Sequence, residues 1–187
     1  MSASRYLVVA ATRAEAAHVP AGLSLVVTGL GKTAAAAATA EALATTDVDG
    51  LTVVNIGTAG SLRPGLAGLF LPSTVLNHDL SAEVVRALGY DPQELLTVPD
   101  GDGTVLATGD TFVTERAVRE RLAETAHLVD MEGYAVVYAC RRRGVPVRLV
   151  KHVSDDADEQ AMAWPDLVEH SAAELGRWLR REVSVSA

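Results

Sequence analysis

Aromatic residues and cysteines are scarce in this sequence, and no apolar run approaches the length of a membrane span. Phe, Trp and Tyr make up 4% of the 187 residues, so Ala, Val and Leu must fill the core. The single cysteine, Cys140, cannot form a disulfide within the chain and is expected to be a small core residue. The apolar run near the N-terminus is about seven residues long, too short for a signal peptide or for the ~20 residues of a membrane span. We therefore expect a cytoplasmic protein with no membrane partner.

Basic residues are too few for a nucleic-acid-binding protein. The chain has 16 Lys and Arg against 24 Asp and Glu, a net charge of −8, whereas a nucleic-acid groove needs clustered positive charge. The one basic run, Arg141–Arg143, has another explanation, because cations in a last turn, Gly144 as cap and Pro146 beyond it are the signals that end a helix. With 49% hydrophobic and 21% charged residues, we expect one ordinary globular domain over residues 1–187 and no nucleic-acid partner.

Short apolar runs bounded by polar or small residues recur along the chain and predict buried strands. The first three lie at 6–11, 23–28 and 51–56, and the alanine-rich segment 33–46 has high helix propensity. A glycine-rich turn is predicted at 57–61. Further strands are predicted at 104–108 and 146–153, and further helices at 81–89, 115–125, 132–143 and 164–183. This alternation indicates an α/β fold with a largely parallel sheet.

Two of these helices carry more detailed signals. Thr114 is the expected N-cap of the helix at 115–125. The closing helix is predicted to be amphipathic, because four apolar residues recur at helical spacing: Leu167, Ala172, Leu175 and Leu179.

Two groups of carboxylates stand at the ends of predicted strands. Asp130 and Glu132 form one group, and Asp155, Asp156 and Asp158 form the other. If the two strands are parallel neighbours, both groups emerge at the edge of the sheet where ligands bind in open α/β folds. The spacing does not match a calcium loop, so we expect no metal. The alternatives are a solvated turn and a carboxylic acid placed for proton transfer.

Other polar positions carry weaker signals. The loop 29–32 before the alanine-rich helix is a possible anion site, but it matches neither a P-loop nor the full dinucleotide motif. Glu15 follows the first strand, and its spacing alone favours an exposed glutamate in a first helical turn. Phe112 can stack on a flat ligand or plug the core, and His78 beside Asp79 can form an acid–base pair or a polar turn.

Five blocks of this sequence resemble the nucleoside phosphorylase/nucleosidase superfamily, and within it the 5′-methylthioadenosine/S-adenosylhomocysteine nucleosidases. They occur in the family's order: TGLGK at 28–32, VVNIGTAGSL at 53–62, TGDTFV at 108–113, VDMEGYA at 129–135 and VPVRLVKHVSDDAD at 145–158. The pair VDMEGYA and VSDDAD at this separation is specific, whereas TGLGK alone is not. The resemblance implies a three-layer α/β domain with a mixed, largely parallel sheet flanked by helices.

The resemblance also implies hydrolysis of the N-glycosidic bond of a purine nucleoside, without a metal or organic cofactor. Asp155 matches the general acid that protonates N7 of the leaving purine, Glu15 the base that activates water, and Glu132 the carboxylate that holds the ribose hydroxyls. The matching substrate-binding residues are Met131 against the sugar, Phe112 stacked on the base, Val113 reading its edge by its backbone, and Thr58, Ala59, Gly60 and Ser154 lining the pocket. Family members are commonly dimers, so we expect a homodimer.

Three departures from the family pattern keep alternatives open. Thr12 and Arg13 stand where typical nucleosidases have a more acidic run, and Lys151 and His152 stand where the family usually has Arg and a small residue. The segment 62–103, which helps to form the 5′-substituent pocket, is short. One alternative is a phosphorylase with phosphate near the loop 29–32 or Arg13, although a carboxylate at Glu15 repels phosphate. The other is an inactive nucleoside-binding protein on the same fold.

Overall fold

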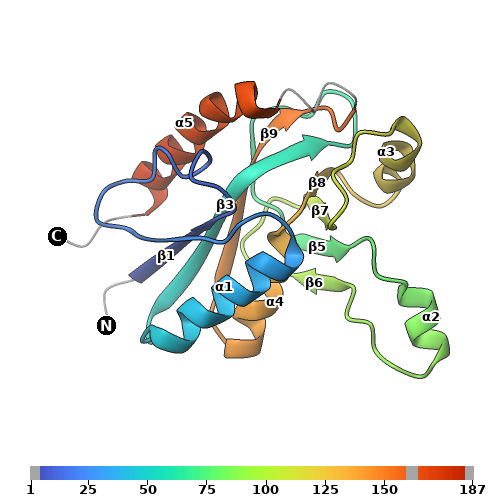
Figure 1. The fold of residues 1–187 in the computed structure, drawn as a ribbon, viewed down its shortest axis with the longest axis horizontal. Coiled ribbons are helices and arrows are strands. Elements are labelled where there is room, and N and C mark those ends of the chain that lie inside the picture. The colour runs from blue at the N-terminus through green and yellow to red at the C-terminus, as the bar shows by residue number, and fades with distance from the viewer. Residues whose placement is uncertain (1–4, 159–163, 184–187) are drawn as a thin grey trace.

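The computed structural model describes residues 5–158 and 164–183, and in this part of the chain one 9-stranded sheet lies between helices (Figure 1). The strands are β1 (Arg5–Ala10), β2 (Ser24–Val27), β3 (Leu51–Ser61), β4 (Leu69–Phe70), β5 (Thr74–Asn77), β6 (Leu95–Thr97), β7 (Val105–Thr108), β8 (Leu128–Asp130) and β9 (Val147–Asp155). The helices are α1 (Lys32–Thr45), α2 (Ala82–Ala87), α3 (Arg116–Ala123), α4 (Gly133–Arg143) and α5 (Trp164–Glu182).

The sheet is mixed and largely parallel, as predicted. Its main order is β2-β1-β3-β8-β7-β5-β6, and β9 pairs with both β3 and β4. Five pairs are parallel (β1–β2, β1–β3, β3–β9, β5–β7 and β7–β8), and three are antiparallel (β3–β8, β4–β9 and β5–β6). The sheet therefore places the carboxyl ends of β1, β3 and β9 at one edge.

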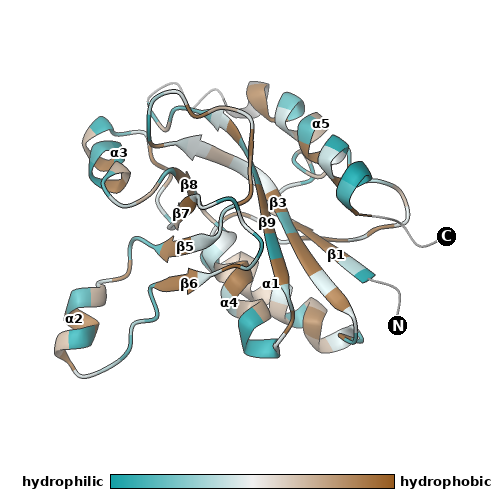
Figure 2. Cartoon of the chain, turned by 180° about the vertical axis from the view of Figure 1, so that it is seen from behind, coloured by the Kyte–Doolittle hydropathy of each residue, from teal (hydrophilic) through white to brown (hydrophobic). Residues whose placement is uncertain are grey.

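The core has two faces, because successive strand residues point to opposite sides of the sheet. Val9 on β1 belongs to the cluster that packs against α1 and α4, through Leu43 and Val136. The neighbouring Val8 packs on the other side with Leu175 and the rest of α5. Hydrophobic residues accordingly mark the strands and the inner helix surfaces (Figure 2). The three layers follow from this alternation.

Helix ends and faces agree with the sequence in part. Gly144 caps α4 in the left-handed conformation with φ 67, as the stop signals predict. The N-cap of α3 is Glu115 rather than Thr114, so that prediction is wrong by one residue. Leu167 is 39% exposed, so its predicted place on the apolar face of α5 is also wrong. The buried stripe passes through Val168, which stands four residues before Ala172.

The predicted turn at 57–61 is instead the second half of β3. This strand continues along β9 as far as Gly60, with a register shift between Ala59 and Gly60, and then pairs with β8. The small side chains let the strand pass close to neighbouring groups, since a Cβ added at Gly60 would lie 2.9 Å from the Cβ of Ala157. The segment is a strand because its backbone pairs with β9 along 57–60 and with β8 at Gly60 and Ser61.

The two carboxylate groups meet in a different way from the one predicted. β8 and β9 are not parallel neighbours, because β3 lies between them and runs antiparallel to β8. Gly60 pairs with Asp155 on one side and with Val129 on the other. The end of β3 therefore brings both acidic groups to one place.

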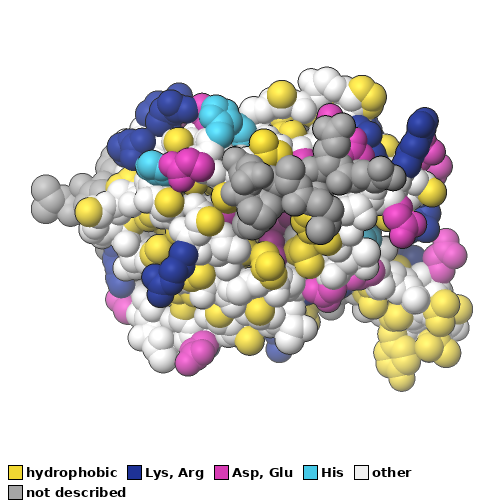
Figure 3. Space-filling view, turned by 45° about the horizontal axis from the view of Figure 1, so that its top comes forward, with side chains coloured by type: hydrophobic (Ala, Val, Ile, Leu, Met, Phe, Trp, Pro, Cys, Tyr) yellow, Lys and Arg dark blue, Asp and Glu magenta, His cyan; other side chains and the backbone are white. Residues whose placement is uncertain are grey.

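The segment 62–103 forms β4, β5, α2 and β6, and α2 confirms the helix predicted at 81–89. Residues 78–94, which contain α2, connect β5 to β6 as an arm that projects from the body of the molecule (Figure 1). Hydrophobic side chains gather on this arm (Figure 3), among them Val84, Leu88 and Tyr90, which are 59%, 69% and 71% exposed. Among the described helices, none has the length and apolar character needed to cross a membrane.

Candidate active site

An open cavity of about 640 Å³, counting solvent at its mouth, lies where β3, β8 and β9 end. All ten residues assigned to the site from the sequence line it: Glu15, Thr58, Ala59, Gly60, Phe112, Val113, Met131, Glu132, Ser154 and Asp155. Leu30, Thr111, Val129, Asp130 and Ala157 complete its wall.

Glu15 lies in the turns after β1, and its carboxylate is held by four hydrogen bonds. Thr58 donates its backbone N–H (2.8 Å) and its hydroxyl (2.9 Å) to Oε1, and Thr12 donates its N–H (3.1 Å) and hydroxyl (3.0 Å) to Oε2. The residue is 4% exposed and no helix begins there, so the interpretation as an exposed first-turn glutamate is wrong. The network fixes the carboxylate at the cavity wall.

Glu132 is the N-cap residue of α4 and is also buried. Its Oε1 accepts a hydrogen bond from the Gly31 N–H at 2.8 Å, across 101 positions of sequence. Burial and the neighbouring Asp130 carboxylate raise the pKa of Glu132 to about 7, although the Lys151 ammonium and the Gly31 N–H act in the opposite direction. The side chain therefore changes charge near neutral pH.

A buried ion pair supports these carboxylates. Lys151 Nζ lies 2.8 Å from Asp130 Oδ2, and both side chains are nearly inaccessible to solvent. Asp130 also accepts the Thr108 hydroxyl at 2.6 Å and the Gly133 N–H at 2.8 Å. Burial disfavours the ammonium, but the surrounding carboxylates, Asp130 first, outweigh it and raise the pKa of Lys151.

Sequence reasoning missed this pair, although a signal existed. Lys151 interrupts the apolar run of β9, and a lysine inside a buried strand requires a counterion. A search for that counterion would have pointed to one of the strand-end acids.

Asp155 ends β9 with both carboxylate oxygens engaged. Ser154 Oγ donates to Oδ2 at 2.6 Å, and the Ala157 N–H donates to Oδ1 at 2.9 Å. A Cβ at Gly60 would lie 3.1 Å from Oδ1, so the strand passes directly beside the acid. Asp156, by contrast, is exposed near Arg119 and does not line the cavity. The acidic cluster thus contributes one carboxylate to the site.

The opposite part of the cavity wall is apolar. Phe112 is 45% exposed, so it does not plug the core as the alternative interpretation required, and its ring lines the cavity. Leu30, which is 62% exposed, and Val113, which is buried, also line the cavity. An aromatic ring and aliphatic side chains of this kind can hold a flat heterocycle by stacking and apolar contact.

Two backbone N–H groups of the loop 29–32 already bind the protein's own acids. The Gly31 N–H binds Glu132, and the Lys32 N–H binds Asp110 Oδ1 at 2.7 Å. Lys32 Nζ contacts Asn77 Oδ1 at 2.8 Å and the carboxylate of Asp79. A phosphate at this loop would have to displace these partners.

Asp79 therefore does not act as the partner of a catalytic His78. Its carboxylate binds Lys32 and the Asp110 N–H, and His78 does not line the cavity. Burial lowers the pKa of His78. In the ranges 5–158 and 164–183, no group of three or more His, Cys, Asp or Glu is arranged to hold a metal ion.

Comparison with known proteins places this arrangement in a family. The model of the Phosphorylase superfamily matches residues 21–183. The aminodeoxyfutalosine nucleosidase of Helicobacter pylori strain J99 is 28% identical over 151 residues, which cover 68% of this chain and 66% of that protein. A 5′-methylthioadenosine/S-adenosylhomocysteine nucleosidase of Shewanella frigidimarina is 29% identical over 175 residues, 75% of this chain and 72% of that protein. The match to the Helicobacter protein thus spans just under two thirds of that protein's length.

Solved structures share the fold. A mutant of the Helicobacter pylori methylthioadenosine nucleosidase, with 5′-methylthioadenosine in its active site, has a TM-score of 0.82 at 22% identity and covers 96% of this chain and 98% of that one. The nucleosidase of Colwellia psychrerythraea in complex with adenine has a TM-score of 0.79 at 23% identity, covering 92% and 91%. Since the family model extends over most of the sequence, this chain belongs to the Phosphorylase superfamily.

Proposed function

We propose that the protein is a nucleosidase that hydrolyses the N-glycosidic bond of an adenine-type nucleoside. One observation carries the proposal: Glu15, Glu132 and Asp155, from distant parts of the chain, line one cavity together with the ring of Phe112. Such a cavity offers an acid, a base and a sugar-binding carboxylate around a surface suited to a planar base. The named relatives that match this chain are nucleosidases, which supports the same reaction class.

In the proposed reaction Asp155 acts on the leaving base. Its proton passes to N7 of the purine while the electron pair of the C1′–N9 bond moves to the base, which leaves as a neutral molecule. A positioned acid contributes about 10²- to 10⁴-fold to such a step. The hydrogen bonds from Ser154 and the Ala157 N–H hold the carboxyl group in place.

Water completes the reaction at C1′. The sugar develops oxocarbenium character, water adds to C1′, and Glu15 takes the water's proton. The four hydrogen bonds from Thr12 and Thr58 keep the Glu15 carboxylate fixed for this task. The products are the free base and the free sugar, and the proton taken by Glu15 balances the one given by Asp155.

The ionised form of Glu132 holds the sugar. The carboxylate accepts hydrogen bonds from the ribose hydroxyls and faces the positive charge that develops at C1′. Because the pKa of Glu132 is about 7, the fraction of enzyme with this carboxylate ionised rises through neutral pH. The rate constant kcat/KM is therefore expected to rise with pH over the same range.

Two observations favour water over phosphate as the nucleophile. A buried carboxylate at Glu15 repels an anion, and the N–H groups of Gly31 and Lys32 already bind carboxylates of the chain. The test of the proposed function is a panel of purine nucleosides, including adenosine, 5′-methylthioadenosine and aminodeoxyfutalosine, assayed for free base by chromatography. Tight binding of one of them without base release would favour the binding-protein alternative instead.

We also propose that two copies associate. The apolar side chains of the arm at 78–94 are exposed, which is costly for an isolated chain and suits a protein interface. Light scattering after size exclusion should give twice the chain mass of 19.6 kDa, and Leu88→Asp should shift the particle toward the mass of one chain.

A further inference from the structure

Lys32, Asn77, Asp79 and Asp110 form a polar group beside the cavity, called the Lys32 cluster below. The Lys32 ammonium binds Asn77 Oδ1 at 2.8 Å and the Asp79 carboxylate, and lies 3.8 Å from Asp110 Oδ2. The Lys32 and Asp79 side chains are 19% and 29% exposed, so solvent screens this group only in part. The cluster joins the start of α1 to the ends of β5 and β7.

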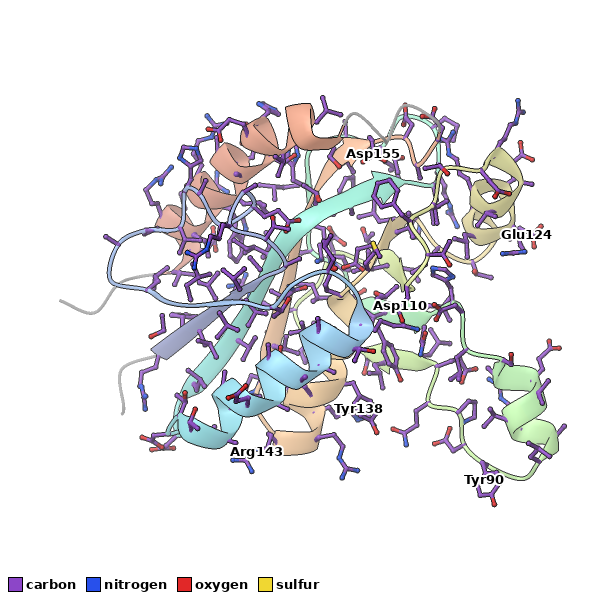
Figure 4. The ribbon with its side chains drawn as sticks, viewed as in Figure 1. Tyr90, Asp110, Glu124, Tyr138, Arg143 and Asp155 are labelled. Carbon is purple, nitrogen blue, oxygen red and sulfur yellow. The ribbon has the colours of Figure 1, made fainter. Side chains whose placement is uncertain are left out.

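Asp110 links the cluster to two backbone segments. Its Oδ1 accepts the Lys32 N–H at 2.7 Å, and its own N–H donates to Asp79 Oδ2 at 2.8 Å. Oδ1 also lies 3.0 Å from the position that a Cβ would take at Gly31, whose φ is +90. Figure 4 shows Asp110 beside the start of α1. The carboxylate thus packs directly on the loop 29–32.

That loop is in turn bound to the site. The next N–H along it, from Gly31, is the donor to Glu132 Oε1. Leu30 precedes this donor, and Thr111 and Phe112 follow Asp110, and all three line the cavity. The same cluster therefore holds both loops of the apolar wall and the donor to Glu132.

We propose that the Lys32 cluster is a positioning group, which fixes the Gly31 N–H against Glu132 and sets the spacing between Leu30 and Phe112. It touches no reacting atom and acts through these residues. This inference rests on the proposed function only for its kinetic effect, because the link to Glu132 is made by the protein's own groups.

Asp110→Ala removes the acceptor of the Lys32 N–H and leaves the loop 29–32 less restrained. Hydrogen bonds to charged groups are among the stronger ones, so kcat/KM should fall about tenfold. The Gly31 N–H lowers the pKa of Glu132, so weakening that bond should move the titration of Glu132 to higher pH. The other groups that face Glu132, namely Asp130, Lys151 and Glu15, are unchanged in this variant.

Asp110→Asn keeps an oxygen at the same place and should restore most of kcat/KM and the original titration. The matched control is Asp47→Asn at the other end of the sheet. Asp47 also accepts a backbone N–H, from Asp49 at 3.1 Å, and binds a cation, Arg5 at 2.9 Å. This control should leave both readouts at the wild-type values.

The experiment measures the Glu132 titration by carbon NMR, with the signal assigned by its loss in Glu132→Gln, together with kcat/KM for base release. A titration shifted upward in D110A and restored in D110N supports the proposal. An unchanged titration in folded D110A overturns it. If D110A does not fold, Asp79→Ala replaces it and must shift the titration in the same direction.

The NMR readout needs no turnover. A wild-type protein that releases no base would therefore count against the proposed function alone, while the titration still decides the role of the cluster.

Discussion

Replacing Glu132 by glutamine should stabilise the protein at alkaline pH while it damages the site. The pKa of Glu132 is raised from 4.5 to about 7, first by burial and then by the Asp130 carboxylate. The folded state therefore binds this proton more tightly than the unfolded state. Its contribution to stability is fully present below about pH 4.5 and is lost as the pH rises through about 7.

The size of this stability effect follows from the two pKa values of Glu132, 4.5 and about 7. The ionised Glu132 costs up to about 3 kcal/mol of unfolding free energy at pH 8 and about 1 kcal/mol at pH 5. Glutamine does not titrate, and its oxygen can still accept the Gly31 N–H. Glu132→Gln should therefore exceed the wild type in stability by about 3 kcal/mol at pH 8, and by much less at pH 5. Its kcat/KM should nevertheless fall by about 10²- to 10³-fold, because the carboxylate that faces the developing charge is gone.

The assay is urea unfolding at the two pH values, followed by the fluorescence of tryptophan, since Trp178 is buried on α5. Glu124→Gln, at an exposed position at the end of α3, is the control and should change stability little at either pH. Two results would show that burial does not raise the pKa of Glu132 in this way. One is a Glu132→Gln variant no more stable than the wild type at pH 8, and the other is a stability difference between the two proteins that is the same at both pH values.

Two substitutions and one labelling experiment test other parts of the structure. Asp155→Asn should lower kcat for base release by about 10²- to 10⁴-fold with little change in KM, and an undiminished kcat in steady-state assays would remove Asp155 from the acid role. Gly60→Ala should lower the free energy of unfolding in urea by about 1–3 kcal/mol and should also lower kcat. The reason is that the added Cβ would lie 2.9 Å from the Ala157 Cβ and 3.1 Å from Asp155 Oδ1. A variant as stable and active as the wild type would show that this packing is loose. Burial raises the pKa of Cys140 to about 12, so iodoacetamide at pH 8 should label this thiol only after unfolding, as mass spectrometry can check.

The fold was predictable where a local pattern determines it. Apolar runs marked most of the buried strands, and Gly144 with the preceding arginines marked the end of α4. The strand at 57–61 was not predictable from the sequence, because its small residues are typical of a turn. They form a strand only through pairing with β8 and β9. In the arm at 78–94 the helix predicted at 81–89 is confirmed as α2, whereas the short strands β4, β5 and β6 around it were not predicted, since they carry no strong periodicity.

The residues of the site were predictable, but their partners were not. Glu15, Glu132 and Asp155 stand at the ends of predicted elements, and the structure brings all three to the cavity. Their catalytic roles stay predictions. The pairing of Lys151 with Asp130, and of Gly31 with Glu132, depends on which strands and loops become neighbours in space. No local pattern in a single sequence determines such contacts.

The most direct test of the central claim is the dependence of base release on phosphate. The wild-type protein is incubated with the best nucleoside of the panel in phosphate-free buffer and in buffer with added phosphate, and the base and sugar products are separated. We expect the same rate of base release in both buffers, with free sugar as the second product. Base release only with phosphate, accompanied by a sugar 1-phosphate, would contradict it.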